Sequence, residues 1–200
     1  MSEKAVFIDK DGTLIENVPF NIEPELIRLS PNCVAGLRML YQAGYKFVVV
    51  SNQDGVARGY FREADLERVR RCLEELLGAM DVPLTGFYCC PHHPDGIVKR
   101  YRKQCDCRKP MPGLLLRAAR RLDLDLSASW MVGDILNDIE AGKRAGCRTI
   151  LINNGNEREW RVDNSLRKPD YLAQSINSAA SIITAFSKRD RYLMEHLRHE

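Results

Sequence analysis

The sequence predicts an α/β fold: a doubly wound, Rossmann-like parallel sheet with helices on both faces. Short, uninterrupted apolar runs recur along the chain, which is typical of strands that are covered on both faces. Amphipathic segments with helical spacing separate these runs, and such an alternation forms parallel sheets. Polar residues follow several runs directly, where the carboxyl edge of the sheet is open to ligands. No large helical insertion interrupts the pattern, so we expect short loops rather than a large cap over that edge.

Length and composition indicate one globular domain. The chain has 200 residues, of which 44% are hydrophobic and 28% charged, enough for a sizeable core. A net charge of +3 is too weak to indicate a nucleic-acid partner, and no apolar run approaches the ~20 residues of a membrane span. Residues 1–4 carry no signal-peptide core. We therefore expect a cytoplasmic monomer with a domain at 1–186 and a charged tail at 187–200.

The first predicted strand covers residues 5–8 and ends in two carboxylates. Asp9 and Asp11 follow the run Ala-Val-Phe-Ile, and Gly12 comes next. A buried carboxylate is costly unless a cation, hydrogen bonds or water compensate it, so this loop indicates a functional site. An acidic turn without function is the alternative, because Asp and Gly are ordinary turn residues.

A loop and a helix follow the first strand. Residues 15–24 contain two prolines and two asparagines, which indicates a loop lying over the first site. Ser30 is the expected N-cap of the helix, with Pro31 in its first turn and Gly44 at its end. The apolar face of this helix is predicted to be Val34, Leu37, Leu40 and Tyr41.

The second predicted strand, residues 46–50, ends at a hydroxyl and two amides. Ser51, Asn52 and Gln53 come directly after it and could donate hydrogen bonds to phosphate oxygens. A plain polar loop is the alternative. Residues 63–80 have the spacing of a long amphipathic helix.

The remaining chain continues the alternation of strands and helices. The expected elements are a strand at 87–89, a helix opened by Pro112 and Gly113, a strand at 130–132, a helix ending near 146, and strands at 149–152 and 171–172 before a helix at 176–186. In the tail, an apolar stripe of Leu193, Met194 and Leu197 could face a partner, although a solvated or frayed helix is the expectation.

Two pairs of metal-binding residues lie after the third predicted strand. Cys90-x-His92 and Cys105-x-Cys107 supply three sulfurs and one imidazole, which is a usual tetrahedral zinc set. His93 is the competing ligand, and four unrelated polar residues in a loop are the alternative. The seven cysteines of a cytoplasmic protein are expected to be thiols or metal ligands. Four protein ligands leave no open position, so the zinc would be structural and would order the loop at 90–107.

Chemistry-bearing residues gather at the carboxyl ends of the predicted strands. Asp9, Asp11, Ser51 and Asp134 follow three of them, and Arg108 and Lys109 follow the last zinc ligand directly. Three acidic residues favour a hard cation with oxygen ligands, and Mg²⁺ is the simplest choice. A cation, a lysine and a hydroxyl together could share the charge on a transferring phosphoryl group. The pattern therefore indicates an enzyme that acts on a small phosphorylated substrate.

Four motifs resemble those of haloacid-dehalogenase-type phosphatases in order and spacing, over about residues 4–155. They are Phe-Ile-Asp-Lys-Asp-Gly-Thr at 7–13, Ser-Asn-Gln at 51–53, Lys109-Pro110, and Gly133-Asp134-x-x-x-Asp138. The Cys-x-His and Cys-x-Cys pairs narrow the resemblance to the D-glycero-D-manno-heptose 1,7-bisphosphate 7-phosphatases and the histidinol-phosphate phosphatases. Residues 52–59 and the long spacer between the pairs are more similar to the heptose group, whereas Asp54-Gly55 also occurs in the histidinol group.

This resemblance implies a role for each motif residue. Asp9 is the nucleophile that forms an aspartyl-phosphate, and Asp11 is the general acid and base. Mg²⁺ is held by the side chains of Asp9 and Asp134 and by the main-chain oxygen of Asp11. Ser51 and Lys109 hold phosphoryl oxygens. The implied substrate contacts are Arg108, which would recognise a second phosphate, and the weaker candidates Asn17, Val18, Pro19, Phe20, Asn52, Gln53 and Arg58.

The function favoured by this resemblance is Mg²⁺-dependent hydrolysis of the 7-phosphate of D-glycero-D-manno-heptose 1,7-bisphosphate. Histidinol-phosphate hydrolysis is the alternative within the family. A non-catalytic zinc-containing binding module is a distant alternative that leaves the three aspartates unexplained. Asp138 is expected to support the site rather than to bind metal. Ile135 departs from the pattern, because many relatives carry a basic residue after the metal-binding aspartate.

Overall fold

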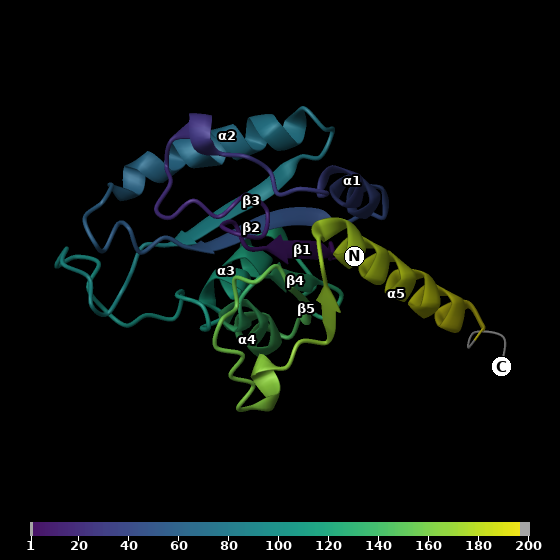
Figure 1. Cartoon of the computed structure of the whole chain (residues 1–200). Helices are drawn as coiled ribbons and strands as arrows, with labels where there is room; N and C mark the ends of the chain where they lie inside the picture. The colour runs from purple at the N-terminus through teal and green to yellow at the C-terminus, as the bar shows by residue number, and fades with distance from the viewer. Residues whose placement is uncertain (1, 197–200) are drawn as a thin grey trace.

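The computed structural model describes residues 2–196, with side chains for residues 2–188. Six strands form one parallel sheet in the order β3-β2-β1-β4-β5-β6 (Figure 1), which confirms the predicted doubly wound fold. The strands are β1 (Ala5–Ile8), β2 (Lys46–Asn52), β3 (Leu84–Cys90), β4 (Trp130–Gly133), β5 (Arg148–Ile152) and β6 (Tyr171–Ala173). The helices are α1 (Val34–Gln42), α2 (Leu66–Gly78), α3 (Gly113–Leu122), α4 (Leu136–Ala145) and α5 (Ile176–His196), with short 3₁₀ turns η1 (Pro24–Leu26), η2 (Glu63–Asp65) and η3 (Ser165–Arg167).

The two faces of the sheet carry different helices, because successive strand residues point to opposite sides. Val6 and Ile8 of β1 belong to a core shared with α1, α2 and α5. Ala5 and Phe7 belong to a second core shared with α3 and α4. The two helical layers lie on opposite sides of the sheet in Figure 1. Both faces are therefore covered, as the uninterrupted apolar runs predicted.

The chain changes its direction across the sheet between β1 and β4. β2 and β3 lie on one side of β1, whereas β4, β5 and β6 lie on the other. At such a switch point the loops after neighbouring strands diverge and leave a crevice at the carboxyl edge. β1 and β4 are parallel neighbours with Ile8 opposite Val132, so Asp9 and Asp134 are brought to the same edge.

The first helix begins later than predicted. α1 starts at Val34, and Ser30 is not its N-cap. The Ser30 N–H instead donates to the Leu14 oxygen at 2.9 Å, so this part of the chain runs against the loop after β1. The cap comes from a distant residue, because the Asn177 side-chain oxygen accepts the Gly36 N–H at 2.5 Å. A side chain 141 positions away in sequence thus replaces the local signal.

Other boundaries differ by smaller amounts. Leu37 and Leu40 of α1 are buried as predicted, whereas Val34 and Tyr41 are exposed. The helix predicted at 63–80 is divided between η2 and α2.

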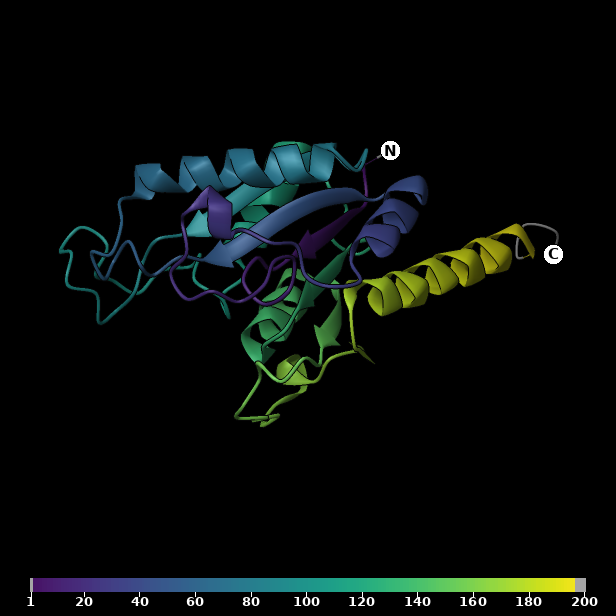
Figure 2. The same cartoon turned by 45° about the horizontal axis from the view of Figure 1, so that its top comes forward.

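α5 continues beyond the helix predicted to end at residue 186 and reaches away from the sheet past α1 (Figures 1 and 2). The predicted tail therefore begins within this helix. The proposed stripe of Leu193, Met194 and Leu197 lies outside the residues whose side chains are described. No helix within residues 2–196 is both long and apolar enough to cross a membrane.

Candidate active site

Lys109 lies in the interior between two carboxylates. Its Nζ contacts Asp9 Oδ1, lies 2.6 Å from Asp138 Oδ1 and donates to the main-chain oxygen of Val50 at 2.9 Å. Burial opposes the charge of Lys109, but the carboxylates of Asp138 and Asp9 outweigh burial and raise its pKa. Lys109 is therefore a fixed cation at the carboxyl end of β1.

Asp134 is held by two neutral donors. Thr13 Oγ1 donates to Asp134 Oδ1 at 3.0 Å, and Asn156 Nδ2 donates to Oδ2 at 2.6 Å. Burial, together with the charges of Asp9 and Asp138, raises the pKa of Asp134 to about 7. A carboxylate in this environment gains strongly from a nearby cation, which is the property expected of a metal ligand.

Gly12 allows the loop after β1 to approach Asp134. Its φ of +86° suits glycine, and a Cβ at this position would lie 2.3 Å from Asp134 Oδ2 and 2.4 Å from Asn156 Nδ2. Asn154 Nδ2 also donates to the Gly12 oxygen at 2.6 Å. The glycine of the Asp-x-Asp-Gly motif is thus required by the close packing of the loops at the sheet edge.

Asp9, Asp134 and Asp138, which we call the acidic cluster, each offer a carboxylate oxygen, and these oxygens lie within 4.8 Å of one another. Oxygen atoms from carboxylates are the ligands that Mg²⁺ prefers. Asp138 has other partners, because its Oδ1 pairs with Lys109 and its Oδ2 accepts the Ile135 N–H at 3.2 Å. Burial raises the pKa of Asp138 to about 6, although Lys109 opposes this shift. The donor set therefore fits a divalent cation, with Asp138 supporting Lys109.

Asp11 lies beside a second buried lysine. Lys10 Nζ is 2.5 Å from Asp11 Oδ1, and Gln53 Nε2 donates to Asp11 Oδ2 at 2.8 Å. Burial raises the pKa of Asp11, and the charge of Asp9 adds to this, although Lys10 lowers it. A carboxyl group that retains its proton more readily is suited to general acid catalysis. The contribution of Lys10 was not predicted, although its position between two aspartates was visible in the sequence.

The residues after β2 connect the loops of the site. Gln53 Nε2 also donates to Ser51 Oγ at 2.9 Å. Asn52 makes two hydrogen bonds with the main chain of Lys109, because its Oδ1 accepts the Lys109 N–H and its Nδ2 donates to the Lys109 oxygen, both at 3.0 Å. Asn52 therefore fixes the backbone that carries the buried lysine.

Two adjoining cavities open at this edge of the sheet. The inner cavity, about 210 Å³, is lined by Asp9, Asp11, Asn17, Ser51, Asn52, Lys109, Asp134, Ile135 and Asn156. The outer cavity, about 130 Å³, is lined by Asp11, Asn17, Val18, Pro19, Phe20, Asn52, Gln53, Asp54 and Gly55. The structure thus brings the predicted catalytic residues together in one space and most predicted substrate contacts in the next. Asn156 lines the inner cavity and was missed by the sequence analysis, although the asparagine-rich run after β5 could have indicated it.

Arg58 and Arg108 line neither cavity, but both side chains lie next to the carboxylate of Asp54. Arg58 Nε donates to Asp54 Oδ2 at 3.0 Å, and an Arg108 nitrogen lies 3.8 Å from the same oxygen. His93 Nε2 lies 3.3 Å from Arg58 and 3.9 Å from Asp54 Oδ2. Since Asp54 lines the outer cavity, the two arginines are placed beside it. The organising role of Asp54 was not predicted, although its spacing of four residues from Arg58 could have signalled the pair.

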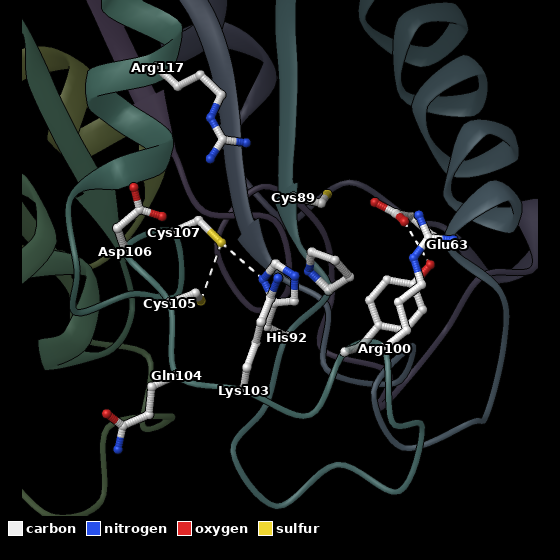
Figure 3. A pocket seen from close by; sticks show the side chains of 12 residues that line it. Glu63, Cys89, His92, Arg100, Lys103, Gln104, Cys105, Asp106, Cys107 and Arg117 are labelled. Carbon is white, nitrogen blue, oxygen red and sulfur yellow. Dashed lines mark hydrogen bonds between the residues drawn. The ribbon is translucent and has the colours of Figure 1, made fainter.

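Cys90, His92, Cys105 and Cys107, which we call the Cys/His cluster, form one set of possible metal ligands within 4.8 Å of one another. Neighbouring ligand atoms are 3.0–3.7 Å apart, the size of a tetrahedron around one zinc ion with bonds of about 2.0–2.3 Å. Figure 3 shows Cys107 beside Cys105 and His92. His93 contacts Arg58 instead, so the geometry favours His92 over its neighbour.

A larger cavity of about 550 Å³ borders the Cys/His cluster, since His92, Cys105 and Cys107 line it, and Figure 3 shows its lining. No residue of the acidic cluster lines it, and it shares no lining residue with the inner or outer cavity. Size alone would therefore select the wrong cavity, since the carboxylates and the buried lysine lie around the smaller one.

Comparisons with known proteins agree with this geometry. A family model described as HAD-hydrolase-like matches residues 106–179. The D-glycero-β-D-manno-heptose-1,7-bisphosphate 7-phosphatase of Salmonella typhi is 37% identical over 191 residues, which cover 95% of this chain and 98% of that protein. A D-glycero-α-D-manno-heptose-1,7-bisphosphate 7-phosphatase of Photorhabdus laumondii is 34% identical over 164 residues, 82% of this chain and 90% of that protein. The structure of D,D-heptose 1,7-bisphosphate phosphatase from B. bronchiseptica, complexed with magnesium and phosphate, has a TM-score of 0.78 and 30% identity, and the match covers 91% of this chain and 98% of that one.

Proposed function

Because the chain belongs to the heptose 1,7-bisphosphate 7-phosphatase family of HAD-like hydrolases, we propose that it is a Mg²⁺-dependent phosphatase that hydrolyses the 7-phosphate of D-glycero-D-manno-heptose 1,7-bisphosphate. The observation that carries the proposal is the pairing of Lys109 with Asp9 in a cavity that Asp134 and Ser51 also line. Phosphoryl transfer depends mainly on positioning and charge, and these residues supply both.

Asp9 is the proposed nucleophile. One of its carboxylate oxygens attacks phosphorus, the bond from phosphorus to the sugar oxygen breaks, and an aspartyl-phosphate forms. Asp11 gives its proton to the departing sugar oxygen and then takes a proton from the water that hydrolyses the aspartyl-phosphate. The raised pKa of Asp11 supports the first of these roles.

The carboxylates of Asp9 and Asp134 and the main-chain oxygen of Asp11 are the proposed holders of Mg²⁺. When bound, the ion offsets negative charge so that an anionic nucleophile can approach an anionic phosphate. Lys109 and Ser51 are placed to hold the phosphoryl oxygens, and Asp138 keeps Lys109 in position.

The charge beside the outer cavity supports a substrate with a second phosphate. Two guanidinium groups, from Arg58 and Arg108, lie beside this cavity and face the carboxylate of Asp54, and a guanidinium is a preferred hydrogen-bond partner of phosphate oxygens. A second phosphate would be attracted there, whereas the ammonium group of histidinol phosphate would be repelled. This favours the heptose bisphosphate over the histidinol alternative.

The test is phosphate release by purified protein from a panel of substrates. We expect the highest kcat/KM with one of the two anomers of heptose 1,7-bisphosphate, a much lower value with histidinol phosphate, and complete loss when a chelator removes Mg²⁺. Relatives of both anomeric names match the chain, so both anomers belong in the panel. A higher kcat/KM with histidinol phosphate than with either heptose bisphosphate would reject the proposed substrate.

The Cys/His cluster is the proposed site of one structural zinc ion, because all four positions of a tetrahedral ion would be filled by protein. Metal analysis of protein purified without added metal should find about one zinc per chain. We also propose that the enzyme acts as a cytoplasmic monomer on this small substrate, without nucleic acid or membrane. Light scattering after gel filtration would test the monomer.

A further inference from the structure

Two exposed aromatic residues meet beside the outer cavity. Phe20, from the loop after β1, is 47% exposed, and Tyr60, from the loop after β2, is 61% exposed. Their ring centroids are 4.7 Å apart with an angle of 72° between the planes, which is a favourable edge-to-face contact. Both loops also supply residues to the cavity lining. The ring pair therefore joins the two walls of the space in which the distal part of a substrate would lie.

The backbone at Phe20 is unusual for a large side chain. Its φ is +54°, and the Asn21 N–H donates to the Val18 oxygen at 3.2 Å, so Pro19 and Phe20 occupy the central positions of a tight turn. Glycine or asparagine is the usual residue at the second central position of a turn with positive φ. A bulky residue in this region is an outlier, and such outliers gather at ligand clamps.

The opposite loop is built to receive the Phe20 ring. A Cβ at Gly55 would lie 3.2 Å from Phe20 Cδ1 and 2.3 Å from Phe61 Cε1. The Gly55 oxygen also accepts the Tyr60 N–H at 2.9 Å, which fixes the backbone of Tyr60 next to this glycine. Gly55 itself lines the outer cavity, and its missing side chain leaves space that Phe61 occupies and that the edge of the Phe20 ring borders.

We propose that Phe20 and Tyr60 form an aromatic clasp that selects and retains the sugar portion of the substrate. Phe20 would contact the sugar directly, because it lines the outer cavity, and Tyr60 is a positioning residue that acts through Phe20. The clasp would take the place of a cap, since the loops around the site are short. This inference rests on the proposed function, because it assumes a substrate that extends from the inner cavity into the outer one.

The clasp predicts a loss that depends on the size of the substrate. Tyr60→Ala should raise KM for heptose 1,7-bisphosphate about three- to tenfold and leave kcat within about twofold. Acetyl phosphate, which has no ring to hold, should keep its wild-type kcat/KM. Tyr60→Phe keeps the ring contact and should restore the wild-type KM, and Phe20→Ala should resemble Tyr60→Ala. Tyr41→Ala is the matched control, because Tyr41 is an exposed tyrosine on α1.

Equal losses with both substrates would mean a general disturbance of the site, and unchanged KM values in Tyr60→Ala and Phe20→Ala would mean that the ring pair holds nothing. Either result overturns the clasp. The proposed function is judged separately, on wild-type protein alone. If wild type hydrolyses neither anomer, the same comparison is made between acetyl phosphate and whichever ring-containing phosphomonoester is hydrolysed fastest.

Discussion

The acidic cluster and the Cys/His cluster are similar in size but differ in what surrounds their ligand atoms. In the Cys/His cluster, the sulfurs and the imidazole nitrogen lie against one another at 3.0–3.7 Å, so protein atoms would fill all four positions of a tetrahedral ion, although three residues of the cluster also line the large cavity. In the acidic cluster, Asp9 and Asp134 border the inner cavity, and lysine, threonine and asparagine side chains contact their carboxylates. The difference between a closed set of soft ligands and an open set of hard ones separates a structural role from a chemical one.

The two clusters are nevertheless connected through the chain. Arg108 alone separates Cys107, in one cluster, from Lys109, which enters the other. An ion that fixes Cys107 would also fix the approach of Lys109 to Asp9.

The largest effect is expected at the nucleophile. Asp9→Asn should lower kcat by at least about 10⁴-fold, because an amide cannot form the aspartyl-phosphate, while the zinc content stays unchanged. Steady-state kinetics and metal analysis measure both. Asp81→Asn, at an exposed position before β3 that belongs to neither cluster, is the matched control and should retain wild-type kcat. Substantial turnover by Asp9→Asn would contradict the assignment.

Removing a ligand from the Cys/His cluster should also reduce the activity of the acidic cluster. Cys107→Ala should lose the zinc ion, lower the thermal midpoint and reduce kcat about 100-fold, because a small displacement of Lys109 is costly. Cys72→Ala removes a half-buried thiol outside the cluster and should keep both zinc and activity. Loss of zinc with full activity would show that the loop positions Lys109 without the ion.

A substitution next to the acidic cluster should change the dependence of activity on the Mg²⁺ concentration. Gly12→Ala places a Cβ against Asp134 and Asn156 in a backbone conformation that favours glycine. The Mg²⁺ concentration for half-maximal activity should rise about 10- to 100-fold, as is usual when groups that orient a metal ligand are disturbed. At Gly78 a Cβ would meet no atom within 4 Å, so Gly78→Ala is the control. Unchanged magnesium dependence in Gly12→Ala would remove Asp134 from the metal site.

The smallest effect concerns pH. The pKa of Asp134 is raised to about 7, well above its ordinary value, so between about pH 4 and pH 7 the folded protein holds a proton that the unfolded chain has released. Stability without metal should therefore fall as pH rises through this window, and Mg²⁺ should restore more stability at pH 8 than at pH 6. The half-saturating Mg²⁺ concentration should rise by up to about tenfold for each pH unit below 7. Thermal unfolding with and without Mg²⁺ tests this, and equal stabilisation by Mg²⁺ at both pH values would contradict it.

Much of the fold was predictable because its strands are short apolar runs whose ends carry polar residues. Ile8 and Asp9 illustrate this, since one pattern gives both a strand and its catalytic edge. The start of α1 was not predictable, because Ser30 pairs with Leu14 and the cap comes from Asn177. Local propensity cannot indicate a partner more than a hundred residues away.

Some residues of the candidate site could likewise be placed from the sequence, and others could not. Residues at strand ends, such as Asp134, could be placed at one edge from the sequence because parallel strands share an edge. Asn156 and Asp54 had only weak local signals, because most of their contacts depend on how separate loops meet in space. The ion pair of Lys10 with Asp11 joins adjacent residues, but only burial makes it important.

Asn52 has a consequence for how this protein can change over evolution. Its side-chain amide hydrogen-bonds to both the N–H and the carbonyl oxygen of Lys109, as a neighbouring strand of a sheet would do. The main chain of Lys109 is thus tied directly to β2, in addition to its link to the Cys/His cluster through Arg108. The loop between β3 and Lys109 can therefore lengthen or shorten at a small cost in conformational entropy, while the residues around the inner cavity keep their positions. Sequence differences among related proteins should therefore concentrate in residues 94–104, between His93 and the second pair of zinc ligands.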